Sequence, residues 1–324
     1  MMSRQSQQGV ALLTILLMVV MATILASSLL ARQQRIVRET AVMTRQNQAM
    51  QYALGGESFL MALLSADEKS SGDTDTLQEV WAKPSPPYPV EDGVVMGRLI
   101  DQSGKFNLNN LYHDGAVDEK ALDFFKRLLD QVGLPPEVAE AVLDWQDPDD
   151  TVTGASGAED SFYLGMQPSR LAANRPFNSI EELKQVRGFE DPESFDAIRK
   201  YVCALPAFAP VNINTADLPV LTAIAPDLDL PAVNDWRNER DSQRKPLDDV
   251  AKLWQIAAFS SVDEKMRGDL SPFLIVKSQY YQAQIKVMLS ERYRYLTSEI
   301  YRQGEQISVY QRSWAPFPPE LKEP

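Results

Sequence analysis

Val10-Ala11-Leu12-Leu13-Thr14-Ile15-Leu16-Leu17-Met18-Val19-Val20 begins an apolar run that continues without a charged residue to Ala31. The 22 residues of this run would form about 33 Å of α-helix, enough to cross the hydrocarbon core of a bilayer. Residues 32–54 contain no Gly or Pro, and their apolar side chains recur at near-helical spacing. We therefore predict one long helix, apolar over 10–31 and amphipathic over 32–54, that ends at Gly55-Gly56.

Three kinds of segment compete for this apolar run. A secretory signal peptide has a shorter apolar core and a cleavage site, whereas this helix continues past its core. A plain membrane anchor fits the length. The third alternative includes the polar residues 1–9, which carry Arg4 and end in Gly9 directly before Val10. This junction resembles the leader of prepilins and pseudopilins, which a prepilin peptidase cuts after the glycine.

The charges around the span do not favour the same topology as the leader. Arg32, Arg35, Arg38 and Arg45 follow the span, whereas Arg4 precedes it. The positive-inside rule would therefore place the C-terminal body in the cytoplasm. The prepilin-like leader implies a body in the periplasm, and we adopt that topology.

The net charge of −13 is concentrated in the middle of the chain. Residues 118–274 contain 29 acidic and 16 basic residues, whereas the two charges balance in the rest of the chain. Such a segment repels nucleic acid and suits cations or basic partners. The single Cys203 excludes an internal disulfide and is predicted to be a core thiol. The single His113 argues against His-rich zinc sites and a His-based catalytic triad.

The most acidic part of this middle region is the segment from Asp144 to Asp160. It places six carboxylates within 17 residues and contains no Lys or Arg. Such carboxylates are either dispersed in solvent or share a hard cation such as Ca²⁺. The spacing is not that of an EF-hand, because Val152 stands at the glycine position and Ala158 at the bidentate glutamate position. Both alternatives, a solvated loop and a Ca²⁺ site, remain open on spacing alone.

The rest of the middle region has the pattern of short helices. Asp118-Glu119-Lys120 and Pro135-Pro136 each begin an amphipathic helix, and later passages echo each other around Ser179-Ile180-Glu181-Glu182-Leu183 and Asp248–Trp254. The passage Asn212-Ile213-Asn214-Thr215-Ala216 followed by a helix resembles a helix-hairpin-helix unit, which grips DNA in many proteins. Ala225-Pro226-Asp227 stands where a Gly-hydrophobic-Gly turn is expected, so we predict a structural use of this unit.

Strand patterns occur before and after the helical region. Residues 93–101 and 105–111 are predicted to form a hairpin, and residues 279–289, 291–302 and 307–314 an antiparallel meander. The predicted fold is α+β, a long N-terminal helix packed on an antiparallel sheet with a large all-α insertion. The expected division is a leader (1–9), a transmembrane half-helix (10–31), a first sheet part (32–117), the insertion (118–274), a second sheet part (275–314) and a tail (315–324).

These motifs together resemble the K-type minor pseudopilins of type II secretion systems. They are the leader at Gly9, Gly104-Lys105-Phe106-Asn107-Leu108-Asn109-Asn110-Leu111, Asp144-Trp145-Gln146-Asp147-Pro148-Asp149, Gly157-Ala158-Glu159-Asp160, Pro176-Phe177 with Glu182-Leu183, and Asn212-Ile213-Asn214-Thr215-Ala216. Most pseudopilins carry Glu at the fifth position after cleavage, where this chain has Thr14. K-type members share this lack, which fits a subunit at the tip of the assembly.

The resemblance implies a function and a set of partners. The chain would cap the periplasmic pseudopilus, anchored by one helix in the Gram-negative inner membrane. It would bind the I- and J-type and then the H-type minor pseudopilins, meet the prepilin peptidase at Gly9 and Val10, and face the secretin or cargo. It would hold Ca²⁺ through residues drawn from Asp147, Asp149, Asp150, Thr151, Glu159 and Asp160. A membrane-anchored DNA-binding protein and a periplasmic hydrolase that uses paired carboxylates are the alternatives.

Overall fold

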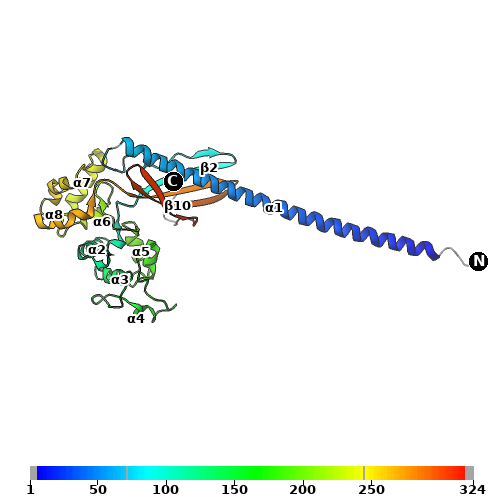
Figure 1. Ribbon diagram of the computed structural model, residues 1–324, viewed down its shortest axis with the longest axis horizontal. Helices are drawn as coiled ribbons and strands as arrows, with labels where there is room; N and C mark the ends of the chain where they lie inside the picture. The colour runs from blue at the N-terminus through cyan, green and yellow to red at the C-terminus, as the bar shows by residue number, and fades with distance from the viewer. Residues whose placement is uncertain (1–5, 71, 244, 318–324) are drawn as a thin grey trace, which may run out of the picture.

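The computed structural model describes residues 6–70, 72–243 and 245–317, so Arg4 and the remainder of residues 1–5, and residues 318–324 of the expected tail, lie outside the described residues. Its longest element is helix α1 (Ser6–Ser70), 65 residues long, which projects far beyond the body of the molecule (Figure 1). Side chains from Val10 to Asn47 are exposed, and Ala49 is the first that is buried. One helix of the described chain is therefore long and apolar enough to cross a membrane.

The prediction that this helix ends at Gly55-Gly56 is wrong, because α1 continues through both glycines to Ser70. At Gly56 the helix backbone lies directly against the sheet. An added Cβ there would come within 2.9 Å of Ile285 Cγ2 and 3.3 Å of Val95 Cγ1. Gly56 therefore lets the helix approach the sheet closely, a role that outweighs its low helix propensity.

The sheet has five antiparallel strands in the order β1-β2-β9-β10-β11. The strands are β1 (Tyr88–Val90), β2 (Gly93–Asp101), β9 (Tyr280–Leu289), β10 (Arg292–Gln303) and β11 (Gln306–Ser313). β2 and β9 are neighbours although more than 170 residues separate them, with Gly93 opposite Leu289 and Asp101 opposite Tyr281. Helix α1 packs on one face through Ala53, Leu60 and Leu64. The predicted mixed fold, with a helical insertion between strands, is confirmed.

The predicted hairpin between 93–101 and 105–111 is not formed. After β2, Phe106–Asn107 is a two-residue strand (β3) parallel to Val202–Cys203 (β6), and Leu108–Asn110 is a short 3₁₀ helix (η1). Buried amide side chains explain the difference. Asn109 Nδ2 donates to the carbonyl oxygens of Phe177 (2.9 Å) and Leu205 (2.8 Å), so the segment bonds to distant loops rather than to β2.

The chain between β2 and β9 consists mainly of short helices, arranged as two lobes beside the sheet (Figure 1). The helices are α2 (Glu119–Gln131), α3 (Val138–Asp144), α4 (Asp160–Tyr163), η2 (Ile180–Gln185), α5 (Pro192–Ile198), α6 (Leu218–Thr222), α7 (Leu230–Gln243), η3 (Val250–Gln255), η4 (Ala257–Phe259), α8 (Glu264–Leu270) and η5 (Ser271–Phe273). The remaining strands are the pairs β4 (Tyr112–His113) with β5 (Ala116–Val117) and β7 (Val211–Asn212) with β8 (Leu274–Ile275).

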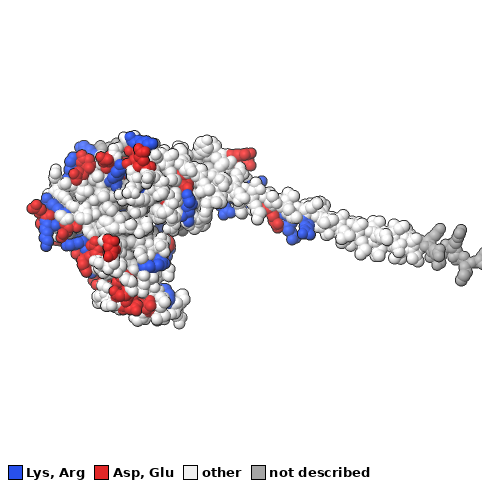
Figure 2. Space-filling model, viewed as in Figure 1, with Lys and Arg blue, Asp and Glu red and all other residues white. Residues whose placement is uncertain are grey.

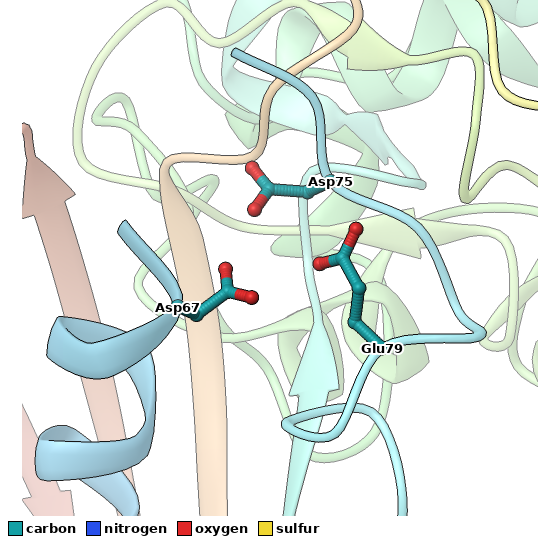
Figure 3. Close-up of side chains that lie close together, drawn as sticks. All are labelled: Asp67, Asp75 and Glu79. Atoms are coloured by element: carbon teal, nitrogen blue, oxygen red, sulfur yellow. The ribbon is translucent and has the colours of Figure 1, made fainter. Parts of the chain in front are cut away.

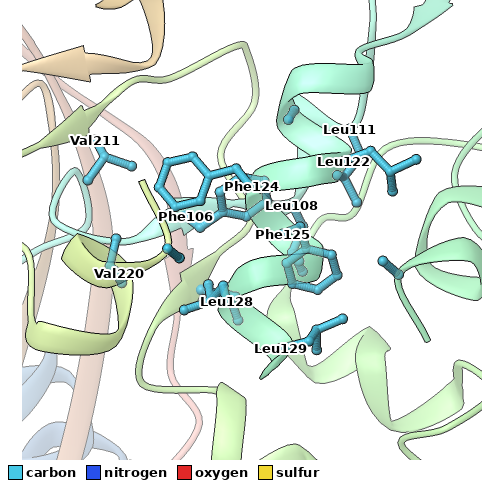
Figure 4. Close-up of a cluster of buried hydrophobic side chains, with 14 of the residues drawn as sticks. Phe106, Leu108, Leu111, Leu122, Phe124, Phe125, Leu128, Leu129, Val211 and Val220 are labelled. Atoms are coloured by element: carbon cyan, nitrogen blue, oxygen red, sulfur yellow. The ribbon is translucent and has the colours of Figure 1, made fainter. Parts of the chain in front are cut away.

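The helical region has its own hydrophobic core, separate from the core between α1 and the sheet. Helix α2 lies at the centre of this core. Asp118 caps its N-terminus, and Leu122, Phe125 and Leu129 follow at helical spacing, so that one face of the helix is apolar and buried. Phe106 stacks on Phe125 at a ring-centroid distance of 5.3 Å, and Figure 4 shows these side chains enclosed by neighbouring elements. The predicted helix from Asp118 and the buried position of Cys203 are confirmed.

A buried polar network joins the helical region to the sheet. Asp101, at the end of β2, accepts hydrogen bonds from the hydroxyls of Thr215 and Ser278, the latter at 2.7 Å. Asn212 donates from Nδ2 to Ser278 Oγ at 2.7 Å. The passage around Asn212 thus ties the points where the chain leaves and re-enters the sheet, which is a structural use of the helix-hairpin-helix-like motif.

Candidate metal centre

The acidic segment from Asp144 to Asp160 connects α3 to α4 in one lobe of the helical region. Figure 2 shows acidic side chains gathered over this lobe. Asp144 is the last residue of α3, and Glu159 directly precedes α4. The two helices therefore hold the ends of the segment, and the loop between them turns back across the end of α3.

Three carboxylates of this segment are buried together. The exposed fractions of Asp144, Asp147 and Glu159 are 0%, 4% and 2%. Asp144 accepts hydrogen bonds from the Thr153 amide at 3.2 Å, but both carboxylate oxygens of Glu159 and Oδ1 of Asp147 are buried without a hydrogen-bond partner. Unpaired buried carboxylate oxygens are unfavourable unless a cation or proton compensates them.

Burial, and then repulsion from neighbouring carboxylates, raises the pKa values of these three groups. Burial, reinforced by Asp144 and Asp147, raises the pKa of Glu159 to about 8. Burial, reinforced by Asp144 and Asp149, raises the pKa of Asp147 to about 6. Burial also raises the pKa of Asp144. The site therefore holds protons near neutral pH unless a metal cation takes their place.

The donor atoms are of the type that a hard divalent cation binds, although these three carboxylates are not gathered within 4.8 Å of one another as those of Asp67, Asp75 and Glu79 are. Asp147 and Glu159 supply the unpaired oxygens, and the three buried carboxylates form no salt bridge with a Lys or Arg of the described chain. Arg187 donates from Nη1 to the Gly157 carbonyl at 2.9 Å and not to one of these carboxylates. All available donors are oxygens, as Ca²⁺ prefers.

The expected ligand set divides into two groups. Asp147 and Glu159 lie in the buried cluster, whereas Asp149, Asp150 and Thr151 are exposed beside it. Asp149 Oδ1 accepts from the Thr151 amide at 2.8 Å. Asp160 Oδ1 accepts from the Ala172 amide at 2.9 Å, which fixes the next loop. Asp147 and Glu159 are thus the buried members of the expected set, and their role as metal ligands stays a prediction.

Asp144 is the residue that the sequence reasoning missed as a ligand candidate. Its spacing from Asp147, one helical turn, is the signal that could have identified it. Gly157 also belongs to the site, because an added Cβ there would lie 2.3 Å from Asp144 Oδ2 and 2.3 Å from the Thr153 carbonyl oxygen. Only a glycine permits this approach of the loop to the carboxylates.

A second carboxylate cluster, not expected from the sequence, lies where α1 ends against the sheet. Carboxylate oxygens of Asp67, Asp75 and Glu79 lie within 4.8 Å of one another, and the three side chains converge in Figure 3. Arg302 of β10 compensates them, with Nη2 paired to Asp75 and Nη1 3.4 Å from Asp67 Oδ2. Glu79 accepts from Trp81 Nε1 at 2.6 Å. This cluster is therefore an internal ion-pair network rather than a metal site.

The residues expected to act at the membrane lie on α1. Gly9 and Val10 belong to the first turns of the helix, so the Gly9–Val10 junction is helical here. Thr14 donates its hydroxyl to the Ala11 carbonyl at 2.9 Å and carries no charge. Cleavage at Gly9 and modification of Val10 stay predictions.

The turn after η2 contains Gly188, which has a φ of 91°. Its amide would be open to an anion if it had no partner within the chain. That amide instead donates to Glu190 Oε2 of the same chain at 2.8 Å. The Gly188 amide is therefore already bonded to a carboxylate of the same chain.

Comparisons with known proteins agree on one family. Two family models, both described as "Type II secretion system (T2SS), protein K", match residues 104–207 and 211–272. The type II secretion system protein K of Pseudomonas aeruginosa is 36% identical over 312 residues, which cover 92% of this chain and 90% of the relative. The protein of the same name from Klebsiella pneumoniae is 30% identical over 95% of this chain and 96% of the relative.

A solved structure supports the same assignment. The crystal structure of the GspK-GspI-GspJ complex from the type 2 secretion system of enterotoxigenic Escherichia coli matches with a TM-score of 0.75 and 26% identity. The match covers 86% of this chain and 100% of the solved chain. By sequence, family models and fold, this chain belongs to the type II secretion system protein K family.

Proposed function

We propose that the chain is a minor pseudopilin that caps the tip of a periplasmic pseudopilus and helps to start and limit its assembly for export of folded proteins. The observation that carries the proposal is the shape of the molecule. One unbroken helix, α1, supplies the membrane half and the packing half of a pilin stem, and a bulky helical region lies at the end of the body away from the apolar stem (Figure 1). Such a region would obstruct a further subunit stacked above this one.

The uncharged side chain of Thr14 also fits a subunit at the tip of the pseudopilus. In this reading no subunit above needs its terminal amine neutralised in the membrane, so a hydroxyl bonded to its own helix suffices. The crystal structure with GspI and GspJ supports I- and J-type pseudopilins as the subunits below, and the H-type would follow. The secretin and the secreted cargo are proposed partners of the helical region, whereas nucleic acid is not.

Ca²⁺ is the proposed structural cofactor, held by Asp144, Asp147 and Glu159, with Asp149, Asp150 and Thr151 nearby. When bound, it would neutralise the three carboxylates and tie the loop of residues 144–160 to α3 and α4. The periplasmic side of the inner membrane is the proposed location of the body. We propose no enzymatic activity.

The processing of the N-terminus tests the proposed function. The full-length chain is extracted from membranes with and without prepilin peptidase, and its N-terminal sequence and intact mass are measured. We expect a start at Val10 with an N-methyl group only when the peptidase is present. A start at Met1 in both strains would leave an ordinary anchored protein and contradict the proposal.

A further inference from the structure

A groove that no proposed role yet uses lies between α1 and the β9–β10 hairpin, on the side of the body nearest the apolar stem. Its volume is about 370 Å³, and we call it the arginine groove. Its floor is apolar and its rim is basic, formed by Val42, Arg45 and Ala49 of α1 and by Leu289, Arg292 and Arg294 of the hairpin. None of its lining residues is acidic.

The three arginines of the groove are uncompensated. Arg45, Arg292 and Arg294 are exposed, and none of them forms an ion pair or a side-chain hydrogen bond within the described chain. Arg292 and Arg294 lie two residues apart on β10 and so point to the same face of the strand. Three unpaired guanidinium groups around an apolar floor repel one another, in a chain whose net charge is −13.

The groove is distinct from the apolar packing face of the stem. Ile36, Met43 and Met50 recur every seven residues and are 52%, 66% and 42% exposed. Arg45 lies two residues from Met43, which places it on the opposite side of the helix. The stem therefore offers an apolar stripe to one neighbour and the arginine groove to another.

We propose that the arginine groove binds a carboxylate-bearing segment of a neighbouring pseudopilin subunit. The inference rests on the proposed function, since it requires that the chain assemble with other pseudopilins. Guanidinium groups bind carboxylates in bidentate fashion, and arginines around an apolar centre are typical of protein interfaces. The positive-inside rule disfavours an arginine such as Arg45 on the periplasmic side of the span. Binding of a carboxylate in the groove would account for its presence there.

Distance favours a protein ligand over lipid headgroups. Arg45 follows Ala31 by 14 residues, which corresponds to about 21 Å along the helix. The headgroup layer takes up roughly 5–7 Å of this separation. The remaining ~14 Å still exceeds the Debye length of ~8 Å at physiological ionic strength, so anionic headgroups are largely screened from the groove.

The test uses the full-length chain co-expressed with the I- and J-type pseudopilins of its own system. Detergent extracts are purified through a tag on this chain, and the co-purified pseudopilins are quantified at increasing salt. The double variant Arg292→Glu/Arg294→Glu should reduce co-purification about tenfold at low salt, and the Lys double variant should retain most of it. Lys83→Glu/Lys265→Glu, which reverses two exposed charges elsewhere, is the matched control and should have no effect.

Binding to vesicles of phosphatidylglycerol is measured for the same variants. If the Glu double variant co-purifies as well as wild type, or loses only vesicle binding, the groove does not take a subunit carboxylate. If wild type itself fails to co-purify with either pseudopilin, the proposed function fails first. A loss confined to the Glu double variant, with folding unchanged by circular dichroism, supports the inference.

Discussion

The two clusters of carboxylates in this molecule differ in how their negative charge is compensated. In the cluster of Asp67, Asp75 and Glu79, the buried Arg302 supplies a positive charge from the neighbouring strand. In the cluster of Asp144, Asp147 and Glu159, no basic side chain of the described residues pairs with the carboxylates, and three oxygens have no hydrogen-bond donor. The clusters resemble each other in composition and differ in compensation.

This difference shows why proximity of acidic groups does not by itself identify a metal site. The tighter cluster is the one that α1, the following loop and β10 enclose, and it carries its own cation. The looser cluster lacks one and so depends on protons or on a metal from outside. The two clusters should therefore respond differently to removal of an arginine and to Ca²⁺.

The largest expected effect follows from removing Arg302. Arg302→Met leaves Asp75 buried beside Asp67 without a counter-charge, and breaking a buried ion pair in this way costs about 3–5 kcal/mol of stability. Thermal unfolding of the full-length chain in detergent should show a large decrease in melting temperature that added Ca²⁺ does not reverse. Arg312→Met, which removes the more exposed partner of Glu57, is the control and should cost less. Equal costs would mean that Arg302 does not compensate this cluster.

Ca²⁺ should have the next largest effect. At a free concentration a hundred times the dissociation constant, a ligand that binds only the folded state stabilises it by about 2.7 kcal/mol. Glu159→Gln should abolish the Ca²⁺-dependent rise in melting temperature and raise the stability of the metal-free protein, because the folded state no longer has to protonate a buried carboxyl group that is ionised in the unfolded chain. Asp75→Asn should retain the Ca²⁺ response. A normal Ca²⁺ response of Glu159→Gln would exclude that residue from the site.

The sequence predicted the large features because each has a local signal. The apolar run after Val10, the alternation in β9 and the Asp118 cap of α2 depend on residues adjacent in the chain. The continuation through Gly55-Gly56 was missed because the reason for it, contact with Ile285, lies more than 200 residues away. Likewise, the sequence identified the acidic segment but not which of its carboxylates are buried. Asp144 is fully buried in the cluster, whereas Asp160 bonds to the Ala172 amide of the next loop. The pairing of Arg302 with Asp75 has no local signal at all.

A smaller effect is expected at the glycine that shapes the looser cluster. Gly157→Ala would place a Cβ within 2.3 Å of Asp144 Oδ2 and so displace the carboxylate. We expect a weakening of Ca²⁺ affinity of about tenfold, or about 1.4 kcal/mol, by isothermal titration calorimetry. Gly268→Ala, where an added Cβ meets nothing within 4 Å, should leave the affinity unchanged. An unaltered affinity in Gly157→Ala would show that the cluster does not hold the ion.

The pH dependence of the metal-free protein tests Glu159 directly. Because the pKa of Glu159 rises from 4.5 to about 8 on folding, the folded protein keeps a proton that the unfolded chain has lost over this range. Stability from this group is therefore fully present below about pH 4.5 and declines as the pH rises towards 8. Asp147, with a pKa of about 6, contributes in the same direction at lower pH.

Melting temperatures measured from pH 5 to 8 without Ca²⁺ should thus fall by a few degrees more in wild type than in Glu159→Gln. Added Ca²⁺ should oppose the decline, because it binds the deprotonated carboxylates and its stabilisation grows with pH. Other buried acids, Asp75, Asp101 and Glu299 among them, also have raised pKa values but are present in both proteins, so the difference between the two curves isolates Glu159. Parallel curves would mean that burial does not raise the pKa of Glu159 in the metal-free protein.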